Sequence, residues 1–267
     1  MEVSSSPRPL AVVTGASSGI GRELAMLCAQ KRYDLIIVAD RGPLQEVAES
    51  LRTFGVEVET VRADLATEEG ISAIEDTIAD RPVEALLANA GHGLGHAFLD
   101  QDFNAVLHVI NTNVVGTLDL VHRVGQGMLL RDSGKILLTG SVAGLVPGSY
   151  QAVYNGTKAF IDSFAYALRD ELKDTNISVT VLMPGATDTN FFERAGMTDT
   201  EVGASEHKAA PAEVAKEGFA AMEDGASDVV AGWKNKLDAL LSHVTPNEIL
   251  AARHGQSAAP GTANRQA

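Results

Sequence analysis

Residues 9–21 read PLAVVTGASSGIG, and this stretch decides the fold. A short apolar run ends at Thr14, glycines follow at positions 15, 19 and 21, and residues 20–32 repeat apolar side chains with the period of a helix. We interpret the stretch as a buried strand, a glycine-rich turn and the beginning of a helix. The rest of the chain repeats this alternation.

Each glycine has a place in such a turn. Gly15 allows a tight turn after the strand, Gly19 lets the backbone approach a phosphate group, and Gly21 lets the helix lie close to the strand. The N-terminus of the helix offers N–H groups and a partial positive charge to a pyrophosphate. The spacing is G-x-x-x-G-x-G, where G-x-G-x-x-G is commoner. We expect the dinucleotide-binding residues of this turn to be Gly15, Ser17, Ser18, Gly19, Ile20 and Gly21.

Segments typical of strands and helices alternate along the whole chain. The expected strands are 9–14, 34–39, 56–62, 85–88, 135–139, 177–183 and 228–231. The expected helices are 20–32, 44–54, 67–79, 102–130 with a bend near 111–116, 150–173, 211–222, 233–243 and 247–252. This alternation predicts an α/β fold of the Rossmann type. We expect a doubly wound, mainly parallel, seven-stranded sheet with helices on both faces, in a three-layer sandwich.

We expect one domain over residues 1–254, a disordered tail over 255–267 and a polar segment with apolar islands over 188–210. The 267-residue chain carries a formal net charge of −14, which disfavours binding to nucleic acid or to anionic lipid. The sequence shows no signal-peptide pattern and no apolar run as long as a membrane-spanning helix. Cys28, the single cysteine, is expected in the core, and we expect a cytoplasmic protein without a metal site.

Ligands in a doubly wound sheet bind beyond the carboxyl ends of the strands. Asp40 follows the second strand, where a carboxylate accepts hydrogen bonds from the adenosine ribose hydroxyls; the alternative is a solvated turn residue. Asp64, followed by Leu65, ends the third strand. Its carboxylate either faces the adenine amino group or marks the beginning of the next helix. Arg41 either binds a phosphate or stacks on adenine.

Residues with acid–base chemistry follow the next two strands. Asn89-Ala90-Gly91 ends the fourth strand and leaves the backbone open beside a dinucleotide, and Ser141 ends the fifth. Tyr154 and Lys158 lie four residues apart on the helix that follows, so the phenol and the ammonium group can point into one cleft. A nearby cation lowers the pKa of a phenol from roughly 10, which makes a general acid or base.

Taken together, these motifs resemble the short-chain dehydrogenase/reductase family, over about residues 8–235. The matching motifs, in chain order, are Thr14 to Gly21, Asn89-Ala90-Gly91, Asn113, Ser141, Tyr154-x-x-x-Lys158 and Pro184-Gly185. Ser141 lies thirteen residues before Tyr154, as that family's catalytic pair does.

The resemblance implies four catalytic residues. Tyr154 would give or take the proton of the substrate oxygen, and Ser141 would hydrogen-bond that oxygen. Lys158 would hold the nicotinamide ribose and depress the tyrosine pKa, and Asn113 would hold a water of the proton relay at a helix bend. The segment beside the nicotinamide would supply Pro184, Gly185, Thr187 and Thr189, the last binding the carboxamide.

The implied activity is hydride transfer between NAD or NADP and an alcohol or ketone, with no metal needed. Asp40 favours NAD because its carboxylate would repel the 2′-phosphate of NADP, whereas Arg41 could bind that phosphate. The resemblance also implies a homo-oligomer, a dimer or a tetramer. Its interface would use the helix after Asp102 and the helix that carries Tyr154.

Two further functions stay open: a Tyr–Lys epimerase or dehydratase, and a non-catalytic dinucleotide sensor. Residues 188–210 contain aromatic and methionine side chains but no cluster of basic ones, which favours an uncharged or apolar substrate. Five residues can be either functional or structural: Phe191, Phe192 and Met197 in this segment, and His92 and His96 after the fourth strand.

Overall fold

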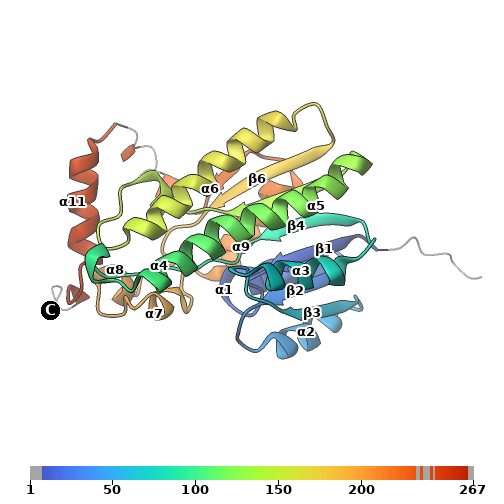
Figure 1. Ribbon diagram of the computed structural model, residues 1–267, viewed down its shortest axis with the longest axis horizontal. Coiled ribbons are helices and arrows are strands. Elements are labelled where there is room, and N and C mark those ends of the chain that lie inside the picture. The colour runs from blue at the N-terminus through green and yellow to red at the C-terminus, as the bar shows by residue number, and fades with distance from the viewer. Residues whose placement is uncertain (1–7, 233–234, 237–240, 243, 264–267) are drawn as a thin grey trace, which may run out of the picture.

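The computed structural model describes residues 8–232, 235–236, 241–242 and 244–263. Within these residues a parallel sheet of seven strands has the order β3-β2-β1-β4-β5-β6-β7 (Figure 1). The strands are β1 (Leu10–Thr14), β2 (Asp34–Ala39), β3 (Val58–Arg62), β4 (Val83–Ala88), β5 (Gly134–Thr139), β6 (Ile177–Met183) and β7 (Asp228–Val230). The predicted α/β fold with a seven-stranded sheet is confirmed, and each observed pairing is parallel.

Helices cover both faces of the sheet and complete three layers. On one face lie α1 (Gly19–Gln30), α2 (Leu44–Arg52) and α9 (Pro211–Glu223). On the other lie α3 (Glu68–Ile78), α4 (Phe103–Ile110), α5 (Thr117–Arg131) and α6 (Ala152–Glu171). Figure 1 shows α4, α5 and α6 crossing in front of the sheet.

Neighbouring residues of each strand face opposite layers, so both faces must be apolar. Val13 belongs to the core cluster that contains Leu24 of α1, whereas Val12 belongs to the cluster that contains Ile74 of α3. Both valines are fully buried. This arrangement explains why β1 and β2 contain continuous apolar runs, whereas the edge strand β3 (VETVR) alternates buried and exposed residues.

The expected bend in the long helix is a π turn, η2 (Asn111–Gly116), between α4 and α5. A π turn adds a residue to one helical turn and often occurs at functional sites. Gly116 packs so closely on the backbone carbonyl of Leu65 that a Cβ would overlap its oxygen. The turn buries the side chain of Asn113.

The C-terminal region differs from the expected disordered tail. Helix α11 runs over Asn247–Ala258, and Ala258 packs in a small cluster with Phe192 and Met197. The hydroxyl of Thr262 accepts a hydrogen bond from the N–H of Glu201 at 2.9 Å. Contacts with a segment some 60 residues earlier order residues 255–263, and local composition does not reveal them. The expected helix over 233–243 falls largely outside the described residues.

The segment 188–210 contains two short helices, α7 (Phe191–Arg194) and α8 (Glu201–Ala204). In the part of the chain that the structure describes, no helix is both long and apolar enough to cross a bilayer. The same residues contain no group of three or more His, Cys, Asp or Glu side chains that could hold a metal ion. Cys28 is fully buried, and burial raises the pKa of its thiol.

We expect Gly116→Ala to lower the free energy of unfolding by about 1–3 kcal/mol, because the added Cβ forces the backbone away from Leu65. The matched control is Gly125→Ala in α5, where a Cβ would meet nothing within 4 Å. That change should raise the free energy of unfolding by about 0.5–1 kcal/mol. Urea unfolding of both variants measures the difference. Equal effects would contradict the close packing of η2.

Candidate active site

A cavity of about 380 Å³ opens at the carboxyl ends of β1, β4, β5 and β6. It lies where the strand order reverses, with β2 and β3 on one side of β1 and β4 on the other. The expected site residues that line it are Gly15, Ser18, Gly19, Ile20, Asn89, Ala90, Gly91, Ser141, Tyr154, Lys158, Pro184, Gly185, Thr187 and Thr189. Those outside its wall are Ser17, Gly21, Asp40, Arg41, Asp64, Leu65 and Asn113.

The glycine-rich turn between β1 and α1 has a backbone that glycine favours. Gly15 and Gly19 have φ angles of +67° and +57°. A Cβ on Gly21 would overlap the carbonyl oxygen of Gly15, so the helix packs directly on the turn. Within the described chain, the side chain of Ser18 makes no capping hydrogen bond to α1. The first N–H groups of α1 are thus available to an anion.

One threonine ties β1 to β4. The hydroxyl of Thr14 accepts hydrogen bonds from the N–H groups of Asn89 and Ala90, both at 3.0 Å. The side-chain amide of Asn89 donates to the carbonyl of Thr14 at 3.2 Å and accepts from the hydroxyl of Thr139 at 3.3 Å. These bonds fix the ends of three adjacent strands at the floor of the cavity.

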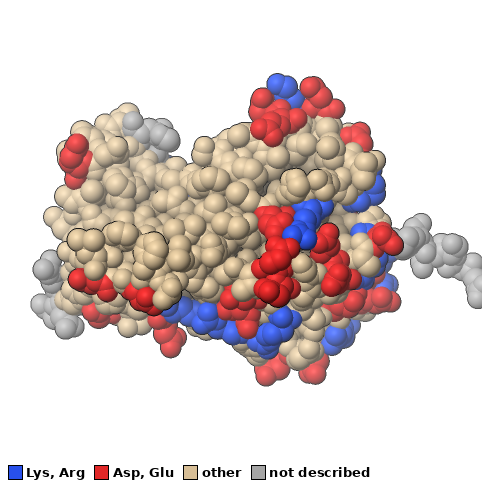
Figure 2. All heavy atoms as spheres, in the orientation of Figure 1, with Lys and Arg blue, Asp and Glu red and all other residues tan. Residues whose placement is uncertain are grey.

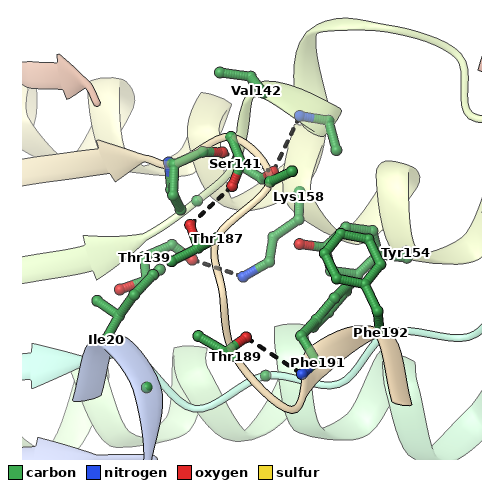
Figure 3. Close-up of a pocket in the computed structure, with 18 of the residues that line it drawn as sticks. Ile20, Thr139, Ser141, Val142, Tyr154, Lys158, Thr187, Thr189, Phe191 and Phe192 are labelled. Carbon is green, nitrogen blue, oxygen red and sulfur yellow. Dashed lines mark hydrogen bonds between the residues drawn. The ribbon is translucent and has the colours of Figure 1, made fainter. Parts of the chain in front are cut away.

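Tyr154 and Lys158 lie one turn apart on α6, and both line the cavity (Figure 3). The Lys158 Nζ lies 5.9 Å from the centre of the Tyr154 ring and donates to the carbonyl of Thr139 at 2.7 Å. Burial raises the pKa of Tyr154 to about 12 and lowers the pKa of Lys158 to about 8. The phenol pKa is therefore raised, contrary to expectation, because lost solvation outweighs the nearby polar groups.

Ser141 precedes the short helix η3 (Val142–Leu145) and is buried. Its Oγ accepts from the N–H of Ala143 at 3.0 Å and donates to the carbonyl of Pro184 at 3.3 Å. The nearby Ser141 hydroxyl opposes the rise in the phenol pKa. Figure 3 shows Ser141, Tyr154 and Lys158 converging on one space.

Asn113 lies behind the cavity and joins three elements. Its Nδ2 donates to the carbonyl of His92 at 2.9 Å and to the Thr157 hydroxyl at 3.0 Å, and its Oδ1 accepts from the N–H of His92 at 2.7 Å. The π turn therefore links the loop after β4 to the helix that carries the tyrosine and the lysine.

Charged and imidazole side chains gather at the ends of β2 and β3. The Asp40 Oδ2 lies 2.7 Å from the Arg41 Nε and 3.7 Å from the His92 Nε2. The rings of His92 and His108 are 4.9 Å apart, and the His108 Nδ1 lies 3.9 Å from the Asp64 Oδ2. Burial lowers the pKa of His92. The carboxylate of Asp40 thus already contacts a cation, which the sequence analysis did not anticipate.

Asp64 shapes the turn before α3 but does not cap that helix. Its Oδ1 accepts from the N–H of Ala66 at 2.9 Å, whereas the N-cap is Thr67, whose hydroxyl accepts from the N–H of Gly70 at 3.0 Å. Leu65 is buried and packs against Gly116.

The segment after β6 closes the far side of the cavity. Thr187 donates to the carbonyl of Gly185 at 3.0 Å, and Thr189 accepts from the N–H of Phe191 at 3.2 Å. The Phe191 ring lies 5.0 Å from the Tyr154 ring. Phe191 and Phe192 line the cavity. Met197, in contrast, packs in the small cluster with Ala258, and His96 is exposed outside the wall.

Sequence reasoning missed several polar residues of the site. Gln151 and His254 line the cavity, and the His254 Nδ1 donates to the carbonyl of Ser149 at 2.9 Å. Asp162 lies buried one turn after Lys158. Its four-residue spacing from Lys158 could have indicated it. No local pattern marks His254, because it reaches the site from the C-terminal helix.

Comparison with known proteins gives a family match over residues 9–200, to the short chain dehydrogenases. The very-long-chain 3-oxoacyl-CoA reductase of Laccaria bicolor is 35% identical over 175 residues, which are 63% of this chain and 52% of that protein. This chain thus spans about half the length of the curated relatives of that name. The uncharacterized oxidoreductase YmfI of Bacillus subtilis is 30% identical over 187 residues, 69% of this chain and 77% of that protein.

A solved structure is also similar over nearly the whole chain. It is a short-chain dehydrogenase from Sphingobium yanoikuyae in complex with NADPH, 29% identical, with a TM-score of 0.79. The alignment covers 88% of this chain and 93% of the other. Since the family match also spans more than half of the chain, this protein belongs to the short-chain dehydrogenase family.

Proposed function

We propose that this protein is an NAD(P)-dependent oxidoreductase that transfers hydride between a nicotinamide dinucleotide and an alcohol or ketone. One observation carries the proposal: Ser141, Tyr154 and Lys158 line the same cavity as the glycine-rich turn after β1. A proton donor, a cation and an anion-binding helix end therefore share one space. Membership of the short-chain dehydrogenase family supports the proposal, as does the NADPH complex of the similar Sphingobium enzyme.

The residues present fit a dinucleotide. Gly19 has a positive φ and packs so closely on Thr189 that a Cβ would overlap that side chain, and the N-terminus of α1 faces the cavity. Gly15, Ser18 and Ile20 would hold the pyrophosphate, and Asp40 would meet the adenosine ribose outside the cavity wall. Thr187 and Thr189 would lie beside the nicotinamide. The cofactor would supply the hydride that the side chains of the chain cannot.

The side chains divide the proton chemistry between them. The Tyr154 hydroxyl would donate its proton to a carbonyl oxygen during reduction and accept it during oxidation. Ser141 would hydrogen-bond the same oxygen, and Lys158 would favour the deprotonated phenol by its charge. Asn113 would hold the loop at His92 in place. As the family resemblance implies, it would also position a water molecule of the proton relay.

The wall beyond Tyr154 fits an uncharged substrate. Its apolar side chains are Val142, Leu145, Val146, Phe191, Phe192 and Val202. Among the described residues of the wall there is no Asp or Glu, and Arg194 is the cation besides Lys158. An apolar ketone or secondary alcohol therefore fits best, and a 3-oxoacyl chain, named for the Laccaria relative, is one such ketone.

A homodimer through α4, α5 and α6 is the assembly that the surface supports. Figure 2 shows a broad uncharged surface over α4 and the neighbouring turns of α6. Phe103, Leu107, Val115 and Phe160 are exposed by 62%, 41%, 54% and 46%. An apolar surface of this kind is typical of the core of a symmetric interface.

We expect Tyr154→Phe to lower kcat by about 10²–10⁴-fold, because the ring stays and the transferable proton is lost. Fluorescence titration with NADH should show unchanged cofactor binding. Tyr150→Phe is the matched control, since Tyr150 precedes α6 and is partly exposed. Near-normal turnover of Tyr154→Phe would falsify the assigned proton donor.

Cofactor choice depends on Asp40 and Arg41. We expect the wild type to favour NAD in kcat/KM and Asp40→Ser to move the ratio toward NADP by about tenfold or more, because a repulsion of about 1.4 kcal/mol is removed. Arg41→Ala should move the ratio in the opposite direction, since it removes the cation nearest to Asp40. A wild type that already favours NADP would show that Arg41 dominates.

The dimer is tested by placing charges on its expected core. Leu107→Glu and Phe160→Glu should convert the protein to a monomer in multi-angle light scattering, because an unpaired charge is costly to bury. Ile249→Glu is the control, as Ile249 is exposed and lies on α11, outside the helices α4, α5 and α6. A wild-type mass of one chain would exclude the dimer.

A further inference from the structure

Asp162 is a buried acid that the proposed proton chemistry does not use. It lies on α6, four residues after Lys158, and is 4% exposed. Residues four apart share one face of a helix. A buried carboxylate is costly unless hydrogen bonds or a cation compensate its charge, so its neighbours decide its role.

Hydrogen bonds satisfy Asp162 only in part. Its Oδ1 accepts from the N–H of Ser141 at a long 3.4 Å, and its Oδ2 has no partner among the described residues. The carboxyl group fills the space beside two glycines, since a Cβ on Gly140 or Gly144 would overlap its oxygens. The acid is therefore packed against the loop that carries Ser141, yet it lacks the hydrogen bonds that would compensate its charge.

The ionisable groups of the described chain that interact with Asp162 lie on its own helix. They are Lys158, Tyr154 and Tyr166, and the pKa of Tyr166 also rises through Asp228 of β7. The loop after β5 offers the backbone of Ser141, and β6 offers the apolar Val181. Lys158 is the cation among these groups, and it lies one helical turn from the carboxylate on the same face of α6.

We propose that Asp162 is a positioning residue of the reaction: its carboxylate keeps Lys158 charged and Tyr154 protonated, and so sets the highest pH at which carbonyl reduction persists. The inference rests on the proposed function as an oxidoreductase. Its geometric basis is the one-turn spacing on α6 and the packing against Ser141.

The direction of the effect follows from the sign of the charge. A carboxylate raises the pKa of both Lys158 and Tyr154, because it favours the protonated form of each. Reduction needs the phenol protonated and the lysine charged. Burial raises the pKa of Asp162 to about 7, with Lys158 opposing, so the carboxylate forms before Lys158, whose pKa is about 8, loses its proton.

The experiment is the pH dependence of kcat/KM for ketone reduction. The enzymes are the wild type, Asp162→Asn, Asp162→Glu and the control Asp170→Asn, whose exposed carboxylate lies on the same helix. We expect Asp162→Asn to move the alkaline limb down by about one pH unit, as removal of one nearby charge does. Asp162→Glu should restore the limb, and Asp170→Asn should leave it unchanged.

Two results separate charge from mere packing. At about pH 6, where Asp162 is largely protonated, the kcat/KM of Asp162→Asn should stay within about twofold of the wild-type value. The ratio of the wild-type kcat/KM to the Asp162→Asn kcat/KM should then increase with pH. An unchanged alkaline limb, or an equal loss at every pH, overturns the inference but leaves the proposed function intact. A wild type with no activity on a panel of ketones, tested with NADH and NADPH, instead overturns the proposed function.

A stability measurement covers the case in which Asp162→Asn does not fold. The double variant Lys158→Met/Asp162→Asn removes both charges, and it should fold at least as well as Asp162→Asn alone if the two groups compensate each other. If the double variant also fails to fold, the acid serves packing and the inference is overturned.

Discussion

The hydroxyl of Thr14 accepts hydrogen bonds from the N–H groups of Asn89 and Ala90, and this junction holds the carboxyl ends of β1 and β4 together. The strand order reverses between these two strands, so their loops diverge and leave a cavity. The Asn89 side chain extends the junction to Thr139 of β5. The carbonyl of Thr139 in turn accepts the hydrogen bond of Lys158. The position of the cation is thus a consequence of how three strands are tied.

Burial is the second constraint, and it acts on several ionisable groups at once. It raises the pKa of Tyr154 and Asp162 and lowers that of Lys158, because each loses the solvation of its charged form. Groups so close together cannot change charge independently, so each pKa value describes the coupled titration of the whole group of side chains. A side chain that never touches the substrate can therefore decide the protonation state of one that does.

The sequence predicts those features that local pattern and spacing determine. Continuous apolar runs located the strands, and β2 and β6 have the predicted bounds because both are buried on two faces. The type and order of the motifs led to the proposed catalytic residues, and the structure brings Ser141, Tyr154 and Lys158 to one cavity. The raised pKa of Tyr154 was not predicted, because burial depends on the whole fold. His254 lies beyond the last expected helix, 247–252, yet it contacts Ser149, 105 residues earlier. Its segment is rich in small and polar residues, and only tertiary contacts order it.

The family match ends at residue 200, whereas the wall of the cavity does not. Val202, Ser242 and His254 come from beyond that limit and line the same space as Tyr154. Proton transfer needs fixed distances on α6 and at the end of β5, but an apolar wall needs only a complementary shape. One methylene in such a wall discriminates by about 1–3 kcal/mol, so selectivity must be spread over several wall side chains. On the proposed function, wall residues beyond position 200, such as Val202 and His254, can therefore change the substrate while the proposed catalytic motifs stay the same. Relatives that share those motifs then need not share a substrate.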